Sequence, residues 1–103
     1  MRDDAQFDQG MALLTARFLS RLSERQQRLQ QGLAEWQAQP ARPPETLLRE
    51  LHSLAGAARL FAHDALGEQA RSLELALPGM RPADATPPLQ ALLQAMQQLG
   101  NAP

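Results

Sequence analysis

The chain has 103 residues with ten arginines, eleven acidic residues and no cysteine, so its formal net charge is −1. This charge balance gives no basis for binding nucleic acid or an anionic membrane, and the lack of cysteine excludes disulfides and thiolate chemistry. Valine, isoleucine and tyrosine, which favour strands, do not occur, and we therefore expect a single all-α domain over residues 1–103.

The N-terminal stretch MRDDAQFDQG is acidic and polar, which is unlike a secretory signal. No apolar run in the sequence approaches the roughly 20 residues that a membrane-spanning helix needs. We therefore expect a cytoplasmic protein with neither a membrane nor a nucleic acid as its partner.

Residues 1–8 are polar, and we expect them to fray. Between Asp8 and Gln37 the apolar residues recur mostly at steps of three and four: Met11, Leu14, Phe18, Leu22, Leu29, Leu33 and Trp36. This periodicity predicts one long amphipathic helix. A break near Gly10 is the alternative, and it would leave a short extra helix at the N-terminus.

A second helix is predicted to begin at Glu45, because prolines at positions 40, 43 and 44 end the first helix. One face of this second helix is apolar and comprises Leu47, Leu51, Leu54, Ala55, Ala58, Phe61 and Ala62. His52 and Gly56 are one helical turn apart and fall on a different face, together with Arg49 and Arg59.

Asp64 is predicted to be the N-cap of a third helix, which Pro78 and Gly79 end. A loop is expected over the segment GMRPADATPP, and Thr86 and Pro87 are predicted to open the last helix. The apolar stripes of these two helices comprise Leu66, Ala70, Leu73 and Leu77, then Leu89, Leu92, Leu93, Met96 and Leu99. Four amphipathic helices with short connections predict an antiparallel (up-down) four-helix bundle.

The sequence offers no metal or nucleotide site. His52 and His63 are about 16 Å apart along one helix, so they cannot share an ion, and the carboxylates are scattered along outer faces. There is no glycine-rich phosphate loop after a strand. Ser53 follows His52, but successive helix positions point about 100° apart, so the two do not form a nucleophile and its base. We therefore expect no metal, no cofactor and no independent enzymatic site.

One chemistry remains available, which is a histidine that acts alone as a nucleophile. A neutral imidazole can accept a phosphoryl group on a ring nitrogen. Gly56 would leave room beside His52 for a partner, and Arg59 and Arg49 could bind phosphoryl oxygens. The alternatives are that His52 is only solvated and that Gly56 permits a close approach of two helices. His63, at a helix junction, is expected to be a terminal or capping residue.

The run HSLAGAARLFAHDALGEQARSLE, from His52 to Glu74, resembles the signature of histidine-containing phosphotransfer (Hpt) domains. That signature is His-x-x-Lys-Gly, then a small-residue stretch and glycine, then a leucine-anchored helix ending in Leu-Glu. The resemblance assigns His52 as the phosphorylated histidine and Gly56 as the adjacent glycine. It also implies that Glu74 hydrogen-bonds the ring of His52, which would leave Nε2 free as the nucleophile.

Two positions depart from the signature. Ala55 stands in place of the lysine that is expected to interact with the phosphoryl group, and Ala62 stands in place of the second glycine. We expect the change at Ala62 to affect only the turn geometry, because alanine is the better helix former. We expect Arg59 or Arg49 to replace the missing lysine in part.

The resemblance implies a histidine phosphotransfer protein of a two-component phosphorelay, which accepts and donates a phosphoryl group at His52. Its implied partners are the receiver domain of a response regulator, a hybrid sensor histidine kinase, or both, and the receiver would bring the Mg²⁺. The expected docking surface combines Leu48, Ala55, Gly56 and Leu60 with the arginines around them, on a monomer. Two alternatives remain, an adaptor that binds a receiver or kinase without accepting phosphate and an unrelated helical scaffold subunit.

Overall fold

The helices account for nearly all of the chain. The computed structural model describes the backbone of residues 2–101 and the side chains of residues 7–101, and it contains no strand in this range. The helices are α1 (Arg2–Ser20), α2 (Leu22–Ala38), α3 (Glu45–Leu60), α4 (Asp64–Ala76), a short 3-10 helix (Leu77–Gly79) and α5 (Pro82–Asn101). No helix within the described residues is long and apolar enough to cross a membrane.

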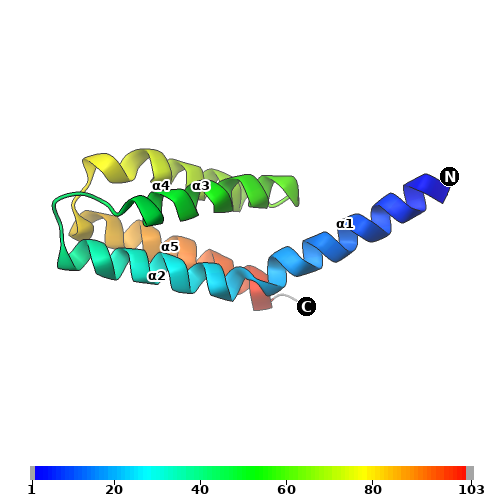
Figure 1. Cartoon of the computed structure of the whole chain (residues 1–103), viewed down its shortest axis with the longest axis horizontal. Helices are drawn as coiled ribbons and strands as arrows, with labels where there is room; N and C mark the ends of the chain where they lie inside the picture. Colours follow the sequence, from blue (N-terminus) through cyan, green and yellow to red (C-terminus); the bar gives the residue numbers. More distant parts are fainter. Residues whose placement is uncertain (1, 102–103) are drawn as a thin grey trace.

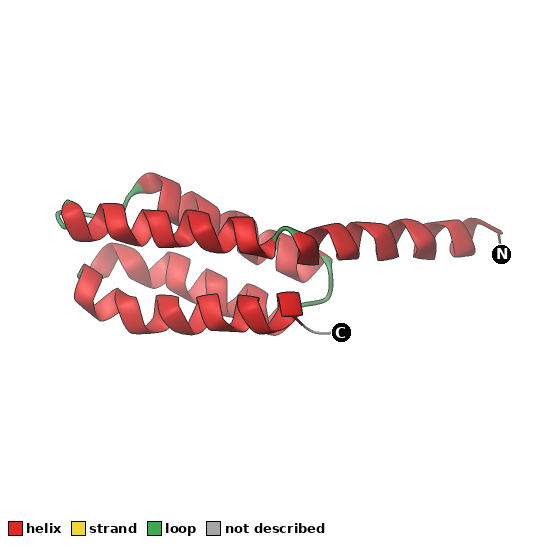
Figure 2. Ribbon diagram, turned by 90° about the horizontal axis from the view of Figure 1, so that it is seen from below, coloured by secondary structure: helices red, strands yellow, loops and turns green. Residues whose placement is uncertain are grey.

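Helices α2 to α5 form an antiparallel bundle in which the α3–α4 pair lies over the α2–α5 pair (Figure 1). The most extensive helix–helix packing is between α3 and α4, and the second most extensive is between α2 and α5. Helix α1 extends away from this bundle, so the molecule measures 55 × 23 × 19 Å (Figure 2). The predicted all-α four-helix bundle is therefore confirmed, with a nineteen-residue helix added at its N-terminus.

The core of the bundle is built from leucine and alanine with one large aromatic residue. Its most deeply buried side chains include Trp36, Leu47, Leu51, Leu54, Ala58, Ala70, Leu77, Leu92 and Met96. Each helix of the bundle contributes one apolar stripe to this core, as the periodicity of the sequence predicts. His52 lies beside the apolar stripe of α3, where the polar side of that helix begins.

The predicted long first helix is divided in two at Arg21. The backbone of Arg21 leaves the helical region (φ −98°, ψ 2°), and its amide donates to both the Arg17 and Phe18 carbonyls at 3.2 Å. Gly10 lies inside α1, so the break near Gly10 is wrong, and the helix already begins at Arg2. The fraying expected near the N-terminus stays a prediction. Met1 lies outside the described residues.

The predicted loop over GMRPADATPP is wrong from Pro82 onwards, because α5 already begins there, and the predicted helix start at Thr86 and Pro87 is therefore wrong as well. Proline is favoured in the first turn of a helix, where its missing N–H has no partner to lose. Ala85 is fully buried, and the Thr86 hydroxyl donates to the Pro82 carbonyl at 2.8 Å. These contacts hold the segment helical although Pro87 follows inside the helix.

The turn between α3 and α4 depends on Ala62, whose φ of 64° is in the left-handed region. The amide of His63 donates to the Ala58 carbonyl at 2.7 Å, and the amide of Ala62 donates to the Arg59 carbonyl at 3.1 Å. These two bonds form a Schellman motif, whose left-handed position favours glycine. Ala62 lies in the turn and outside the helix, so the high helix propensity of alanine does not help at this position. Asp64 is the first residue of α4, and His63 takes the N-cap position without a side-chain cap bond.

We predict that Ala62→Gly raises the free energy of unfolding by about 1 kcal/mol, because glycine adopts the left-handed conformation without a steric penalty. Thermal or urea unfolding measures the change. The control is Ala91→Gly, an exposed position inside α5, where the same substitution should lower the free energy of unfolding by about 1 kcal/mol. A destabilising Ala62→Gly would contradict the assignment of this turn.

Candidate functional site

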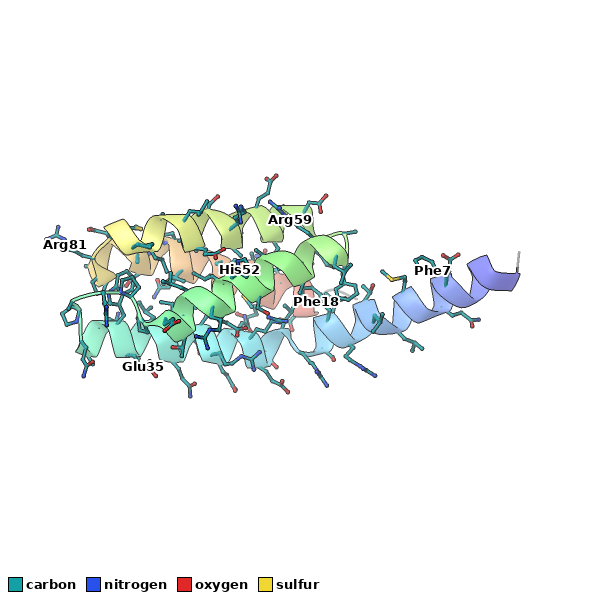
Figure 3. All side chains as sticks on the ribbon, turned by 45° about the horizontal axis from the view of Figure 1, so that its top comes forward. Phe7, Phe18, Glu35, His52, Arg59 and Arg81 are labelled. Carbon is teal, nitrogen blue, oxygen red and sulfur yellow. The ribbon has the colours of Figure 1, made fainter. Side chains whose placement is uncertain are left out.

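His52 projects from the middle of α3, close to the line along which α3 meets α4 (Figure 3). Its side chain is 70% exposed, and its Nδ1 lies 2.8 Å from Oε2 of Glu74 on α4. One edge of the ring is therefore held by a carboxylate, while the edge that carries Nε2 faces away from this contact.

The contact with Glu74 determines which ring nitrogen carries the proton. An ionised carboxylate can only accept hydrogen bonds, so the Nδ1 of a neutral His52 must donate to Glu74. The proton then lies on Nδ1, and Nε2 keeps its lone pair. The Glu74 side chain that accepts this bond is only 21% exposed, and its second oxygen, Oε1, is buried without a hydrogen-bond partner among the described residues.

The distance between His52 and Glu74 is set by how closely α3 and α4 pack. The facing residues are small, and Ala55, Ala58 and Ala70 are all buried. Gly67 of α4 makes the closest approach, because a Cβ at that position would lie 3.1 Å from the Ala55 carbonyl oxygen and 2.9 Å from Cγ of Arg59. The small residues and Gly67 together bring Glu74 within hydrogen-bond distance of the ring.

Gly56 lies one turn after His52 and is exposed. A Cβ built at this glycine would meet no atom within 4 Å. No helix–helix contact within the described chain therefore requires a glycine here, although glycine costs about 1 kcal/mol relative to alanine inside a helix. The structure places open space next to His52, and the alternative that Gly56 permits close helix packing does not apply.

The two predicted arginines differ in their surroundings. Arg59 has its Cγ against Gly67, so the aliphatic part of its side chain is supported by α4, and no ion pair is found for it among the described residues. Arg49 is 71% exposed and donates to Glu45 at 3.0 Å, one turn towards the start of α3. Arg59 is the better anchored of the two and remains available for a ligand anion.

The expected docking residues are placed differently from one another. Leu60 is 67% exposed and Leu48 is half-buried against the core. Ala55 is only 6% exposed because it faces α4, so it has no surface to offer a partner and its inclusion in the docking surface is corrected. Sequence reasoning missed Leu75, which follows Glu74 and is also 67% exposed.

A network of charged residues between α2 and α3 was likewise missed. Glu50 accepts from Arg25 at 3.2 Å and from Arg28 at 3.0 Å, and Arg25 also donates to the hydroxyl of Ser53 at 3.2 Å. The sequence contained a sign of this network, because Arg25 and Arg28 are three residues apart and therefore share a face of one helix. This network fixes the position of α2 beside the exposed side of α3.

His63 is not part of this site. Its ring stacks on Phe18 with centroids 5.8 Å apart and an interplanar angle of 22°, and it is half-buried. Within the described residues there is also no group of three or more histidine, cysteine, aspartate or glutamate side chains that could hold a metal ion.

Comparison with protein families gives one result. The family model described as "Hpt domain" matches residues 14–102, which is nearly the whole chain. Comparison with the curated proteins gives no match, and comparison with the solved structures gives none.

We predict that Glu74→Ala shifts the neutral His52 ring away from the Nδ1–H tautomer by about fivefold, because a hydrogen bond of this kind contributes about 1 kcal/mol. The ¹⁵N chemical shifts of the ring nitrogens measure the tautomer ratio. Glu68→Ala, which removes another exposed acid from α4, is the matched control and should leave the ratio unchanged. Equal ratios in the wild type and Glu74→Ala would show that the contact does not set the tautomer.

Proposed function

Because the chain belongs to the Hpt domain family, whose members are histidine phosphotransfer modules of phosphorelays, we propose that His52 is the residue that accepts and donates the phosphoryl group. The donor and acceptor are aspartates of receiver domains, on a response regulator or a hybrid sensor histidine kinase. The observation that carries this proposal is the 2.8 Å contact of His52 Nδ1 with Glu74 on a side chain that is 70% exposed.

This geometry suits a direct transfer of the phosphoryl group to Nε2 of His52. The lone pair of Nε2 attacks the phosphorus of the receiver's aspartyl phosphate, the bond from phosphorus to the aspartate oxygen breaks, and the carboxylate leaves. The Nδ1 proton stays on the ring, which gains positive charge as the N–P bond forms. Glu74 accepts the hydrogen bond from that proton and stabilises this charge. Donation to a second receiver is the same step in reverse.

The surface around His52 suits a protein partner. Gly56 leaves open space for the approaching aspartyl phosphate, and exposed Leu60 and Leu75 provide apolar contact area on α3 and α4. Leu48 adds to this apolar area, and its buried part packs against the core. An apolar surface with a charged centre is typical of protein interfaces. We therefore propose a docking surface of Leu48, Gly56, Leu60 and Leu75 around His52.

Arg59 takes the role of the missing lysine in this proposal. Its stem is held against Gly67, and it lies two turns after His52 along the same line of α3 (Figure 3). A guanidinium group can form two parallel hydrogen bonds to phosphoryl oxygens. Arg49 contributes less because it is paired with Glu45.

One observation favours a second candidate function, an adaptor that binds a receiver or kinase without accepting phosphate. The observation is that Ala55, which stands in place of the lysine of the Hpt signature, has no charge and is buried in the α3–α4 contact. The third reading, an unrelated scaffold subunit, is disfavoured because His52 is exposed and held by a half-buried carboxylate.

The proposal predicts that incubation with a phosphorylated receiver domain transfers an acid-labile, base-stable label to this chain, and that His52→Gln abolishes the label. The probe is each receiver domain of the source genome after phosphorylation by acetyl phosphate. His63→Gln is the control, because the chain has two histidines and His63 is stacked on Phe18. It should keep the label. Binding of a receiver without any label on the wild type would favour the adaptor.

We predict that Arg59→Ala lowers the rate of transfer to His52 about tenfold, because a lost charge-assisted hydrogen bond costs about 1.4 kcal/mol at a partly exposed site. Arg49→Ala is the matched variant and should change the rate by no more than about twofold, since exposed ion pairs such as that with Glu45 contribute little. Rapid-quench transfer measurements give both rates. Equal effects, or an unchanged rate in Arg59→Ala, would remove Arg59 from the site.

A further inference from the structure

Helix α1 carries an apolar seam that continues beyond the bundle. The seam consists of Phe7, Met11, Leu14 and Phe18, which are separated by four, three and four residues. This spacing is that of the a and d positions of a heptad, and a stripe of this narrow width is typical of coiled-coil helices. Phe7 is 67% exposed and Leu14 is 46% exposed, whereas Met11 is half-buried and Phe18, next to the bundle, is only 5% exposed.

Among the described side chains, aromatic packing on the bundle is found at the end of the seam nearest to it. Phe18 packs on Phe61 with centroids 5.4 Å apart, whereas Phe7 lies on the projecting part of α1, away from every other helix (Figure 3). Contacts of α1 with α2 and α5 are few. An isolated helix of about 15 residues is marginal in water, and Gly10 lowers its stability by about 1 kcal/mol further. A second helix on the seam would supply the missing packing.

The charges along α1 indicate which helix fits. Residues 1–8 contain three aspartates and one arginine, a net charge of −2, whereas residues 9–21 contain two arginines and no acid, a net charge of +2. A parallel copy of α1 would bring like charges together at both ends. An antiparallel copy would place the acidic half of each helix along the basic half of the other.

We propose that α1 pairs with α1 of a second copy of this chain, in an antiparallel arrangement with a twofold axis between Gly10 and Met11. In this register Phe7 faces Leu14 of the partner subunit, and Met11 faces Gly10 of the partner subunit. A Cβ at Gly10 would have no atom of the described residues within 4 Å, so there is room for the partner's Met11. The proposed dimer differs from the monomer that we expect from the sequence.

The dimer leaves the histidine site free. Each bundle is attached to the C-terminal end of its α1 (Figure 1), so an antiparallel pair places the two bundles at opposite ends of a helix pair about 28 Å long. His52 of each subunit lies on α3, outside the seam. Because a contact between two helices of this length buries less than about 1,200 Å², it belongs to the weak, reversible class of interfaces.

Sedimentation velocity of the full chain over a range of concentrations tests the pairing. We expect a reversible monomer–dimer equilibrium for the wild type and a dissociation constant at least about tenfold higher for Leu14→Glu. The matched control is Leu13→Glu, because Leu13 is 72% exposed and lies about 100° around the helix from Leu14. It should leave the dissociation constant within about twofold of the wild type. Circular dichroism verifies that both variants keep the bundle.

Cysteine cross-linking tests the orientation, since the chain has no cysteine of its own. A mixture of Phe7→Cys and Leu14→Cys chains should form the mixed disulfide in preference to either symmetric one. Preferred symmetric disulfides would show a parallel pair and overturn the proposal. A wild type that stays monomeric up to about 1 mM, or an equal loss of dimer in Leu13→Glu and Leu14→Glu, would also overturn it.

Discussion

The hydrogen bond between Nδ1 of His52 and Oε2 of Glu74 is the contact on which the site depends. It joins two helices, so its length of 2.8 Å is a consequence of how α3 and α4 pack along their whole contact. Buried Ala55 and Ala58 and the close approach at Gly67 make that packing tight. A larger residue at any of these positions would move Glu74 away from the ring, so the small residues of the core are part of the site.

The same contact has a cost in stability. Oε1 of Glu74 is buried without a partner among the described residues, and an unsatisfied buried polar atom costs about 1–3 kcal/mol. His52 is 70% exposed, so its hydrogen bond cannot offset all of that penalty. A protein that needed only a stable bundle would place an apolar residue at position 74. Under the proposed function, the carboxylate at position 74 keeps the proton of the His52 ring on Nδ1.

The sequence predicts the bundle and the contact between His52 and Glu74 well, because helical periodicity and the Hpt signature both depend on local residue order. Prediction from the sequence fails where packing between distant segments determines the local structure. Prolines at 82, 87 and 88 indicate a loop, but burial of Ala85 holds this segment in α5. Ala55 lies at the border of the apolar stripe on α3, and only the contact with α4 decides that it is buried. Ala62 looks like a helix former but adopts φ 64° because the chain must reverse there.

We propose that Glu74 holds Nδ1–H and leaves Nε2 as the phosphorylated atom, and ³¹P and ¹⁵N NMR on the phosphorylated protein tests this assignment. We expect a ³¹P–¹⁵N coupling to Nε2 of His52, with the proton retained on Nδ1. A coupling to Nδ1 instead would contradict the assignment, because Nδ1 cannot both hold the phosphoryl group and donate to Glu74.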